Sequence, residues 1–252
     1  MKKLFLIAAV AGLAACSAQP ESGYTVNVTA NGDLAQLPND TLIFTGGTRK
    51  TPVVDTVVLV NGKCTIKGET KTPTYYTLTF KGEKRAFKRF FLENAKFDVV
   101  FDAAAPAEGT VNGGVAQTFI NEYNAKQKEL SAAYGIDSLM KGYAKASEEE
   151  KAVIEETYDK WQKECEAIQN AYLAENPVSD YALAYVASEV GNLPIEEVEA
   201  KLAAFDTIPA FAENVVLKET KETAALIKSL QPGNQAPDFV QNDPDGKPVK
   251  FS

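Results

Sequence analysis

The stretch Asp55–Lys67, DTVVLVNGKCTIK, carries the strongest local structural signal in the chain. Two runs rich in β-branched residues flank Asn61-Gly62, a pair that favours a two-residue type I′ turn between antiparallel strands. Alternation after the turn predicts that Cys64 and Ile66 face inward, while the polar residues between them face solvent. The stretch therefore predicts a β-hairpin with one buried face.

Further segments with period-two alternation lie on both sides of this stretch. Each is a short run of apolar residues, and glycine or asparagine marks many of the turns between them. The segments are residues 24–29, 42–44, 76–80, 87–92 and 97–101. Many short strands with regular turn signals predict an antiparallel β-sandwich over residues 24–112.

After the sandwich, the apolar residues recur with the period of a helix. A first helix carries an apolar stripe from Phe119 to Tyr134, and Gly135 is expected to end it. Ser147 and Glu150 then form a capping box, in which each side chain accepts a hydrogen bond from the backbone N–H of the other residue. The box predicts the start of a second helix.

The second helix has apolar residues at alternating spacings of four and three. This seam consists of Ile154, Tyr158, Trp161, Cys165, Ile168 and Tyr172. Such a seam is typical of helices that pack lengthwise, so we expect this helix to lie antiparallel against the first. Further helices are expected over 180–190, from Pro194 at a first helical position, and over 209–230. Residues 113–231 are thus predicted to be an α-helical region.

The last twenty residues, Gly233–Ser252, read GNQAPDFVQNDPDGKPVKFS. The residue before a proline is pushed out of the α region, so Ala236–Phe239 is expected to be extended. Asp243–Gly246 has the composition of a turn, and Val249 and Phe251 face one way on the returning strand. The sequence therefore predicts a small hairpin, and the chain as a whole is of the α+β class.

This hairpin also resembles a known one. Gly233, Ala236-Pro237-Asp238-Phe239, Asp245-Gly246-Lys247 and Val249–Ser252 are similar to the opening hairpin of thioredoxin-like thiol–disulfide oxidoreductases of TlpA/ResA type and of the related AhpC/TSA peroxiredoxins. The resemblance implies that residues 232–252 begin an α/β domain whose catalytic cysteine lies beyond Ser252. No catalytic residue is then expected in this chain. A generic exposed hairpin is the alternative interpretation.

The β-rich segment resembles a β-domain of unknown function that commonly precedes thioredoxin-like domains in bacterial lipoproteins. The resemblance covers roughly residues 24–123 and rests on Val54–Val57, Asn61–Lys63, Thr74–Tyr76 and Phe91–Asn94. Cys64 departs from the pattern, because an aromatic residue is more usual at that position. The resemblance brings no catalytic residues with it.

The N-terminus reads as a targeting signal. Lys2-Lys3 precedes the apolar run Leu4–Ala15, which is too short to span a bilayer stably and has the flanks of a secretory signal. Leu13-Ala14-Ala15-Cys16 resembles a bacterial lipobox, which implies a signal peptide over 1–15, lipidation of Cys16 and a tether over 16–23. A plain secretory signal is the alternative. Ser17 is not the aspartate of an inner-membrane retention signal, so the outer membrane is favoured for this periplasm-facing lipoprotein.

Composition excludes several classes of function. Removing Lys2 and Lys3 from the 26 basic residues leaves 24 against 34 acidic ones, a net charge of −10 that argues against nucleic acid as a partner. The sequence has no histidine, which excludes Ser-His-Asp and Cys-His catalysis and any zinc site that needs imidazole. We expect no metal and no cofactor.

Two further features each have two interpretations. Cys64 and Cys165 are the thiols left after lipidation, and we expect them to be buried structural residues rather than a redox pair, because neither belongs to a Cys-x-x-Cys motif. The basic and aromatic stretch Lys81–Phe91 suits either anionic lipid headgroups or an outer strand whose basic side chains discourage edge pairing. We expect the outer strand.

These observations lead to one expected function and two alternatives. We expect the chain to be the accessory N-terminal portion of a lipid-anchored, cell-envelope thiol–disulfide oxidoreductase. This portion would position or dimerise the redox domain or select its protein substrates. The membrane, a protein or disulfide substrate and a second copy of the chain are the expected partners. The alternatives are a non-catalytic envelope lipoprotein that binds a protein through the sandwich, and a peroxiredoxin-type enzyme.

Overall fold

The computed structural model of this chain describes residues 23–234, 238 and 240–250. Its β-rich part contains eight strands in chain order: β1 (Tyr24–Asn31), β2 (Thr41–Gly47), β3 (Pro52–Val58), β4 (Lys63–Gly68), β5 (Thr74–Phe80), β6 (Phe87–Leu92), β7 (Lys96–Asp102) and β8 (Gly109–Gly113). The helices that follow are α1 (Val115–Tyr134), α2 (Ile136–Tyr143), α3 (Glu148–Glu175), α4 (Asp180–Glu189), α5 (Ile195–Phe205) and α6 (Val215–Ser229). Strands β9 (Val240–Asn242) and β10 (Pro248–Lys250) come last.

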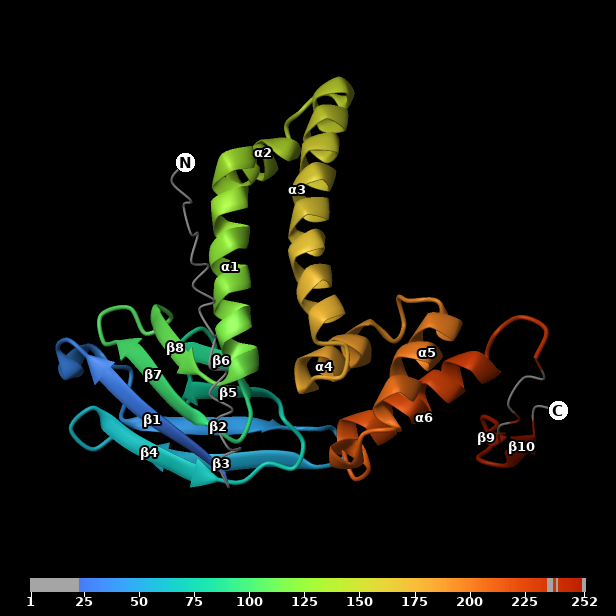
Figure 1. Cartoon of the computed structure of the whole chain (residues 1–252), viewed down its shortest axis with the longest axis horizontal. Helices are drawn as coiled ribbons and strands as arrows, with labels where there is room; N and C mark the ends of the chain where they lie inside the picture. Colours follow the sequence, from blue (N-terminus) through green and yellow to red (C-terminus); the bar gives the residue numbers. More distant parts are fainter. Residues whose placement is uncertain (1–22, 235–237, 239, 251–252) are drawn as a thin grey trace, which may run out of the picture.

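The eight strands form two four-stranded sheets that enclose one core (Figure 1). One sheet has the order β4-β1-β7-β8 and the other β3-β2-β5-β6. Aromatic rings from the two sheets meet between them: Phe80 packs edge-on against Phe101 at 5.0 Å between ring centroids, and Phe90 lies 5.6 Å from Phe97. All four of these side chains are almost fully buried. The predicted α+β class with an N-terminal sandwich is confirmed.

One strand pairing departs from the predicted antiparallel arrangement. β1 pairs with β7 in parallel, from Thr25 opposite Lys96 to Asn31 opposite Asp102. Between these two strands the chain passes through the second sheet twice, as β2–β3 and as β5–β6, and forms the antiparallel neighbour β4 in between. After the second passage it returns as β7, which runs beside β1 in the same direction. Alternation within each strand does not encode this direction, because parallel and antiparallel neighbours both bury alternate residues.

The Asn61-Gly62 turn forms, but the predicted hairpin does not. Both residues have positive φ values, 53° and 73°, as a type I′ turn requires, and Val60 bridges to Lys63 across the turn. However, β3 pairs with β2, and β4 pairs with β1 in the other sheet. The turn therefore carries the chain from the edge of one sheet to the edge of the other, with Leu59 buried beside it.

Helices α1 and α3 form a two-helix arm that stands away from the sandwich, with α2 at its tip (Figure 1). Gly135 ends α1 in the left-handed conformation at φ 64°, and both hydrogen bonds of the Ser147–Glu150 capping box are present. The antiparallel packing of the two long helices is as predicted. The short helix α2 was not expected, although its apolar residues Ile136, Leu139, Met140 and Tyr143 recur at helical spacing over its eight residues.

The lower helices α4, α5 and α6 pack around a second core that includes Leu183, Val198 and Phe205. The single helix predicted over 209–230 is wrong: a 3-10 turn at Pro209–Phe211 precedes α6. Asn214 causes the break, because its side chain accepts the N–H of Leu217 and caps α6. Pro194 was predicted to be the first residue of its helix. It lies at the N-cap position instead, and α5 begins one residue later, at Ile195.

Candidate functional site

The two thiols lie on separate elements and form no disulfide. Cys64 is half-buried on β4, where it packs against the sandwich core, and Cys165 is 3% exposed on α3. Burial raises the pKa of both thiols, and Glu164 and Glu166 raise the pKa of Cys165 further. Because the thiolate is the reactive form, neither cysteine is activated as a nucleophile.

The C-terminal hairpin forms as predicted over the residues that the structure describes. β9 and β10 pair antiparallel, with Pro248 opposite Asn242 at one end and Lys250 opposite Val240 at the other. The Asp243 carboxylate accepts the N–H groups of Asp245 and Lys247, at 3.0 and 2.8 Å, and so fixes the turn. Within this hairpin Gly246 has a positive φ of 81°, the conformation that favours glycine.

The two valines of the hairpin that the structure describes are not covered by the helices. Val240 is 63% exposed and Val249 is 52% exposed. An ion pair of 2.7 Å joins Lys250 to Asp238. Gly233, at φ 95°, lies just after the last helix. The hairpin residues Ala236, Pro237, Phe239 and Phe251 lie outside the described residues, as do Leu13, Ala14, Ala15 and Cys16 of the lipobox-like motif.

The basic stretch forms the predicted outer strand, but one lysine faces the other way. β6 is an edge strand of its sheet. Lys88 alternates with the core residue Phe90, so it points into the sandwich and is only 7% exposed, whereas Phe87 faces solvent. The Lys88 ammonium donates to the Ala107 carbonyl at 2.6 Å, and burial lowers the pKa of Lys88. This lysine ties β6 to the loop between β7 and β8.

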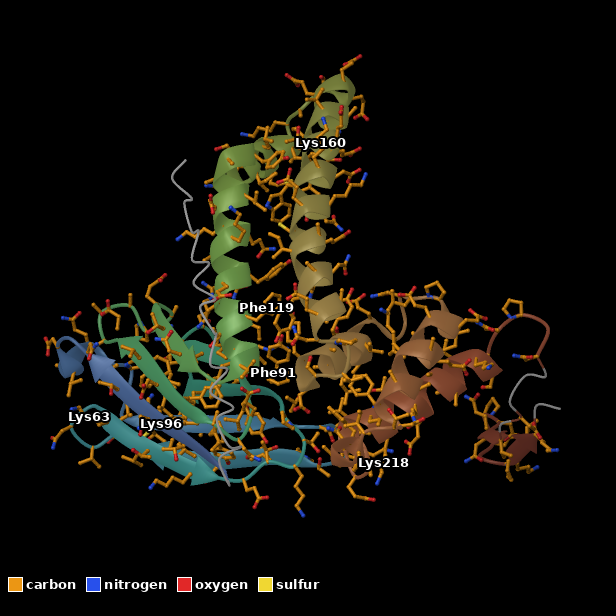
Figure 2. All side chains as sticks on the ribbon, in the orientation of Figure 1. Lys63, Phe91, Lys96, Phe119, Lys160 and Lys218 are labelled. Carbon is orange, nitrogen blue, oxygen red and sulfur yellow. The ribbon has the colours of Figure 1, made fainter. Side chains whose placement is uncertain are left out.

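A cluster of aromatic rings joins the base of the arm to the outer face of the sandwich. Phe91 of β6 and Phe119 of α1, labelled in Figure 2, belong to it together with Tyr181 of α4 and Tyr172 of α3. Phe119 stacks on Tyr172 at 3.7 Å between centroids, and Tyr181 meets both Phe119 and Phe91 at steep angles. The β-strands and three helices therefore share one packed contact.

Two acidic side chains lie at the same junction. The Glu93 carboxylate accepts the backbone N–H of Val115 and so caps the start of α1. Asp180 is the first residue of α4, and burial, followed by the nearby charge of Glu93, raises its pKa to about 6. The Asp180 carboxyl group therefore takes up a proton closer to neutral pH than a solvent-exposed aspartate does.

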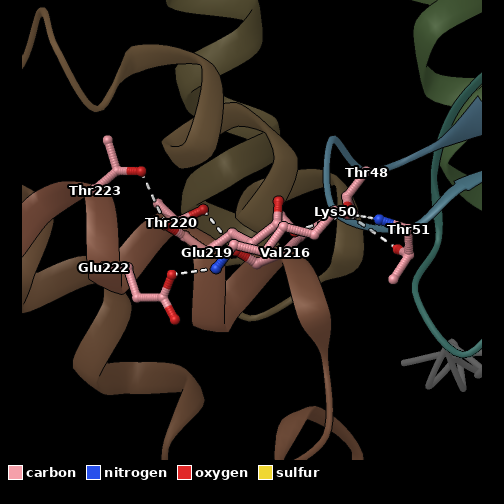
Figure 3. A network of polar contacts seen from close by, with 8 residues as sticks. All are labelled: Thr48, Lys50, Thr51, Val216, Glu219, Thr220, Glu222 and Thr223. Carbon is pink, nitrogen blue, oxygen red and sulfur yellow. Dashed lines mark hydrogen bonds and ion pairs between the residues drawn. The ribbon is translucent and has the colours of Figure 1, made fainter.

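A second contact joins the sandwich to α6. The Thr48 hydroxyl, in the turn between β2 and β3, donates to the Glu219 carboxylate at 2.8 Å, and Lys50 pairs with Glu222 (Figure 3). Both partners of the Lys50 ion pair are largely exposed, so its contribution to stability is small. Together with the aromatic cluster, this contact gives the sandwich and the lower helices a fixed relative position.

Sequence reasoning missed Glu93, Asp180 and the Thr48–Glu219 contact. Glu93 falls in the Phe91–Asn94 segment that carries the family resemblance, and its position directly after a buried strand could have marked it. Asp180 and Glu219 carry no such signal, because their roles depend on which strands the helices reach. Over the described residues no group of three or more potential metal ligands is found.

Comparison with known proteins identifies one region of the chain. Residues 24–120 match the family described as "Domain of unknown function (DUF4369)". The match covers β1–β8 and the start of α1, which confirms the predicted β-domain of unknown function. No curated protein and no solved structure matches the chain. Among the described residues, no helix is both long enough and apolar enough to cross a bilayer.

Proposed function

We propose that this chain is the accessory N-terminal portion of a lipid-anchored, cell-envelope thiol–disulfide oxidoreductase of the thioredoxin-like class. The observation that carries the proposal is the β9–β10 hairpin. Its turn residues resemble those of the opening hairpin of that class. Its two valines are left uncovered beyond α6. A two-stranded hairpin is marginal in water and needs further elements to cover it. The proposed redox domain supplies them.

In this proposal the described residues support the reaction without performing it. Reduction of a disulfide requires a thiolate that attacks one sulfur and displaces the other. Burial raises the pKa of Cys64 and Cys165, which disfavours the thiolate in both. The attacking thiol is therefore assigned to a Cys-x-x-Cys motif outside this chain, while the sandwich and the arm position the redox domain or its protein substrate.

The anchoring part of the proposal rests on the lipobox-like motif alone. Cys16 carries the lipid, and the outer membrane is the favoured location. Expression in a bacterium fed a radiolabelled fatty acid tests this directly. The wild-type chain is expected to incorporate label and the Cys16→Ser variant to lose it, and label retained in the variant would contradict the assignment.

The redox part is tested with the complete gene product. Its reading frame beyond Ser252 is expected to contain Cys-x-x-Cys, and the protein is expected to reduce insulin in the presence of dithiothreitol. A control with both motif cysteines changed to serine should be inactive. A frame without the motif, or a complete protein that reduces no disulfide, sinks the proposal. A single peroxidatic cysteine with peroxide turnover would support the peroxiredoxin alternative instead.

An exposed edge strand favours a second candidate, a non-catalytic lipoprotein that binds a protein through the sandwich. β3 lies at the edge of its sheet, and Val54 and Val58 on it are exposed. Edge strands of this kind can accept an added strand from a partner. Site-specific crosslinking from position 54 in cells should then capture one defined envelope protein, and capture of none would exclude this candidate.

A further inference from the structure

A cavity of about 300 Å³ lies where the sandwich meets α4 and α6. The turn between β2 and β3 contributes Arg49, and the adjacent strands β5 and β6 contribute Tyr75 and Arg89. The helices contribute the opposite wall. The volume is at the lower end of the range for small-molecule sites, so a ligand here would be small.

Arginine is concentrated at this cavity. The chain contains only three arginines, Arg49, Arg85 and Arg89, among 26 basic residues, and two of them line this one cavity. Among the described residues, the Arg49 side chain has no hydrogen bond or ion pair, and the Arg89 side chain has only the face of the Tyr75 ring, 4.3 Å from its guanidinium. The five N–H donors of each guanidinium are therefore free to hold a ligand.

The remaining lining sets the polarity of the cavity. Ala184, Ala187, Val190 and Val216 provide an apolar wall opposite the strands. One acid, Glu219, also lines the cavity, but its carboxylate accepts the Thr48 hydroxyl at 2.8 Å. Two arginines against one glutamate leave the cavity positive, on a chain whose overall charge is −8.

We propose that this cavity binds a carboxylate attached to an apolar body. The planar guanidinium groups match a carboxylate in two-pronged geometry, which a lysine ammonium does not offer. Tyr75, already stacked on Arg89, forms one side of the slot for the apolar body, and the alanine and valine side chains form the other. The carboxylate can belong to a free organic acid or to the C-terminus of a peptide, and the same chemistry recognises both.

Arginine side-chain NMR on the full chain tests the proposal, because three arginines give three resolved Nε–Hε signals. Benzoate and 3-phenylpropionate are the probes, and benzamide is the uncharged control. The carboxylates are expected to shift two of the three signals with a Kd of about 1 mM or below. Arg49→Gln and Arg89→Lys should each weaken binding about tenfold or more, because each loses charge-assisted, two-pronged contacts. Arg85→Gln, which removes the third arginine away from the cavity, should bind as the wild type does.

A second pair of probes distinguishes the two sources of the carboxylate, a free organic acid and the C-terminus of a peptide. A short peptide ending in phenylalanine is compared with the same peptide carrying a C-terminal amide. Tighter binding of the free-acid peptide than of benzoate assigns the site to protein C-termini, and weaker binding assigns it to small acids. The proposal is overturned if the signals do not saturate by about 10 mM carboxylate, or if benzamide shifts them as much as the carboxylates do. It is also overturned if Arg85→Gln weakens binding as much as the other two variants do, or if inorganic phosphate shifts the signals and the carboxylates do not.

Discussion

Phe119 of α1 and Tyr172 of α3 stack almost in parallel, with ring planes 12° apart and centroids 3.7 Å apart. The pair stands at the foot of the arm, so it holds the two long helices together at the place where both meet the sandwich. We expect Phe119→Ala to lower the free energy of unfolding by about 3–4 kcal/mol, since it removes a buried ring and leaves a cavity. Val115→Ala, an exposed change on the same helix, should stay within about 0.5 kcal/mol. Urea unfolding measures both, and similar losses for the two variants would remove the special role of this pair.

Asp180 should make stability fall as the pH rises from about 4 to about 6. Its folded pKa of about 6 lies above the usual 3.8, so the folded state binds the proton more tightly than the unfolded state in this range. The stabilisation is therefore full below pH 4 and is lost as pH rises through 6, by at most about 3 kcal/mol. Asp180→Asn keeps the neutral form at every pH and should be more stable than the wild type at pH 7.5.

Urea unfolding of the wild type and of Asp180→Asn at pH 4, 5, 6 and 7.5 measures the free energy of unfolding of each. The difference between the two proteins at each pH isolates the contribution of the Asp180 carboxyl group. Asp137→Asn, in the first turn of α2, is a control for the loss of one exposed charge. If the difference in free energy of unfolding between the wild type and Asp180→Asn is the same at pH 4 and pH 7.5, burial at the junction does not raise the pKa of Asp180.

Lys88 can be replaced by an apolar side chain of similar length at little cost. Its ammonium is buried over the Phe101 ring, 5.5 Å from the centroid, and the Ala107 residue that accepts its hydrogen bond is itself exposed to water. Lys88→Met should therefore change stability by less than about 1 kcal/mol or increase it. Lys88→Ala should cost about 2 kcal/mol or more, because it leaves a cavity. Thermal unfolding distinguishes them, and a larger loss for the methionine variant would mean that the charge itself is required.

Two glycines offer a matched test of backbone conformation. At Gly62 an added Cβ would lie 2.8 Å from Leu34 Cδ2 on a residue of positive φ, so Gly62→Ala should destabilise by about 1–2 kcal/mol. Gly142 lies in the helix α2 with nothing near its Cβ position, so Gly142→Ala should stabilise by about 0.5–1 kcal/mol. Guanidinium unfolding of both variants checks the signs, and equal signs would contradict the assignment.

Both thiols should react slowly in the folded protein. Cys165 is expected to be the slower, since it is buried while Cys64 is only half-buried. Labelling with iodoacetamide at pH 7.5, followed by mass spectrometry of each peptide, should show both sites modified rapidly only in urea. Fast labelling of either thiol in the folded state would reopen the redox-pair interpretation.

Local chemistry explains which features were predictable. Gly135 and the Ser147–Glu150 box were predicted because a helix end depends on a few adjacent residues. Asn61-Gly62 was predicted as a turn for the same reason, yet its strands pair elsewhere, since the choice of partner depends on residues far along the chain. Lys88 was predictable in principle, because it alternates with Phe90. The convergence of Arg49 and Arg89 was not, because only the assembled sheet and helices bring residues forty positions apart to one cavity.

The position of β1 has a mechanical consequence. β1 is an inner strand, paired with β4 on one side and β7 on the other over most of its length. Tension applied at its N-terminal end acts along the strand, so the hydrogen bonds of both ladders share the load in shear instead of opening one at a time. A pull from that end is therefore resisted by both ladders at once, and β1 detaches only when the two fail together.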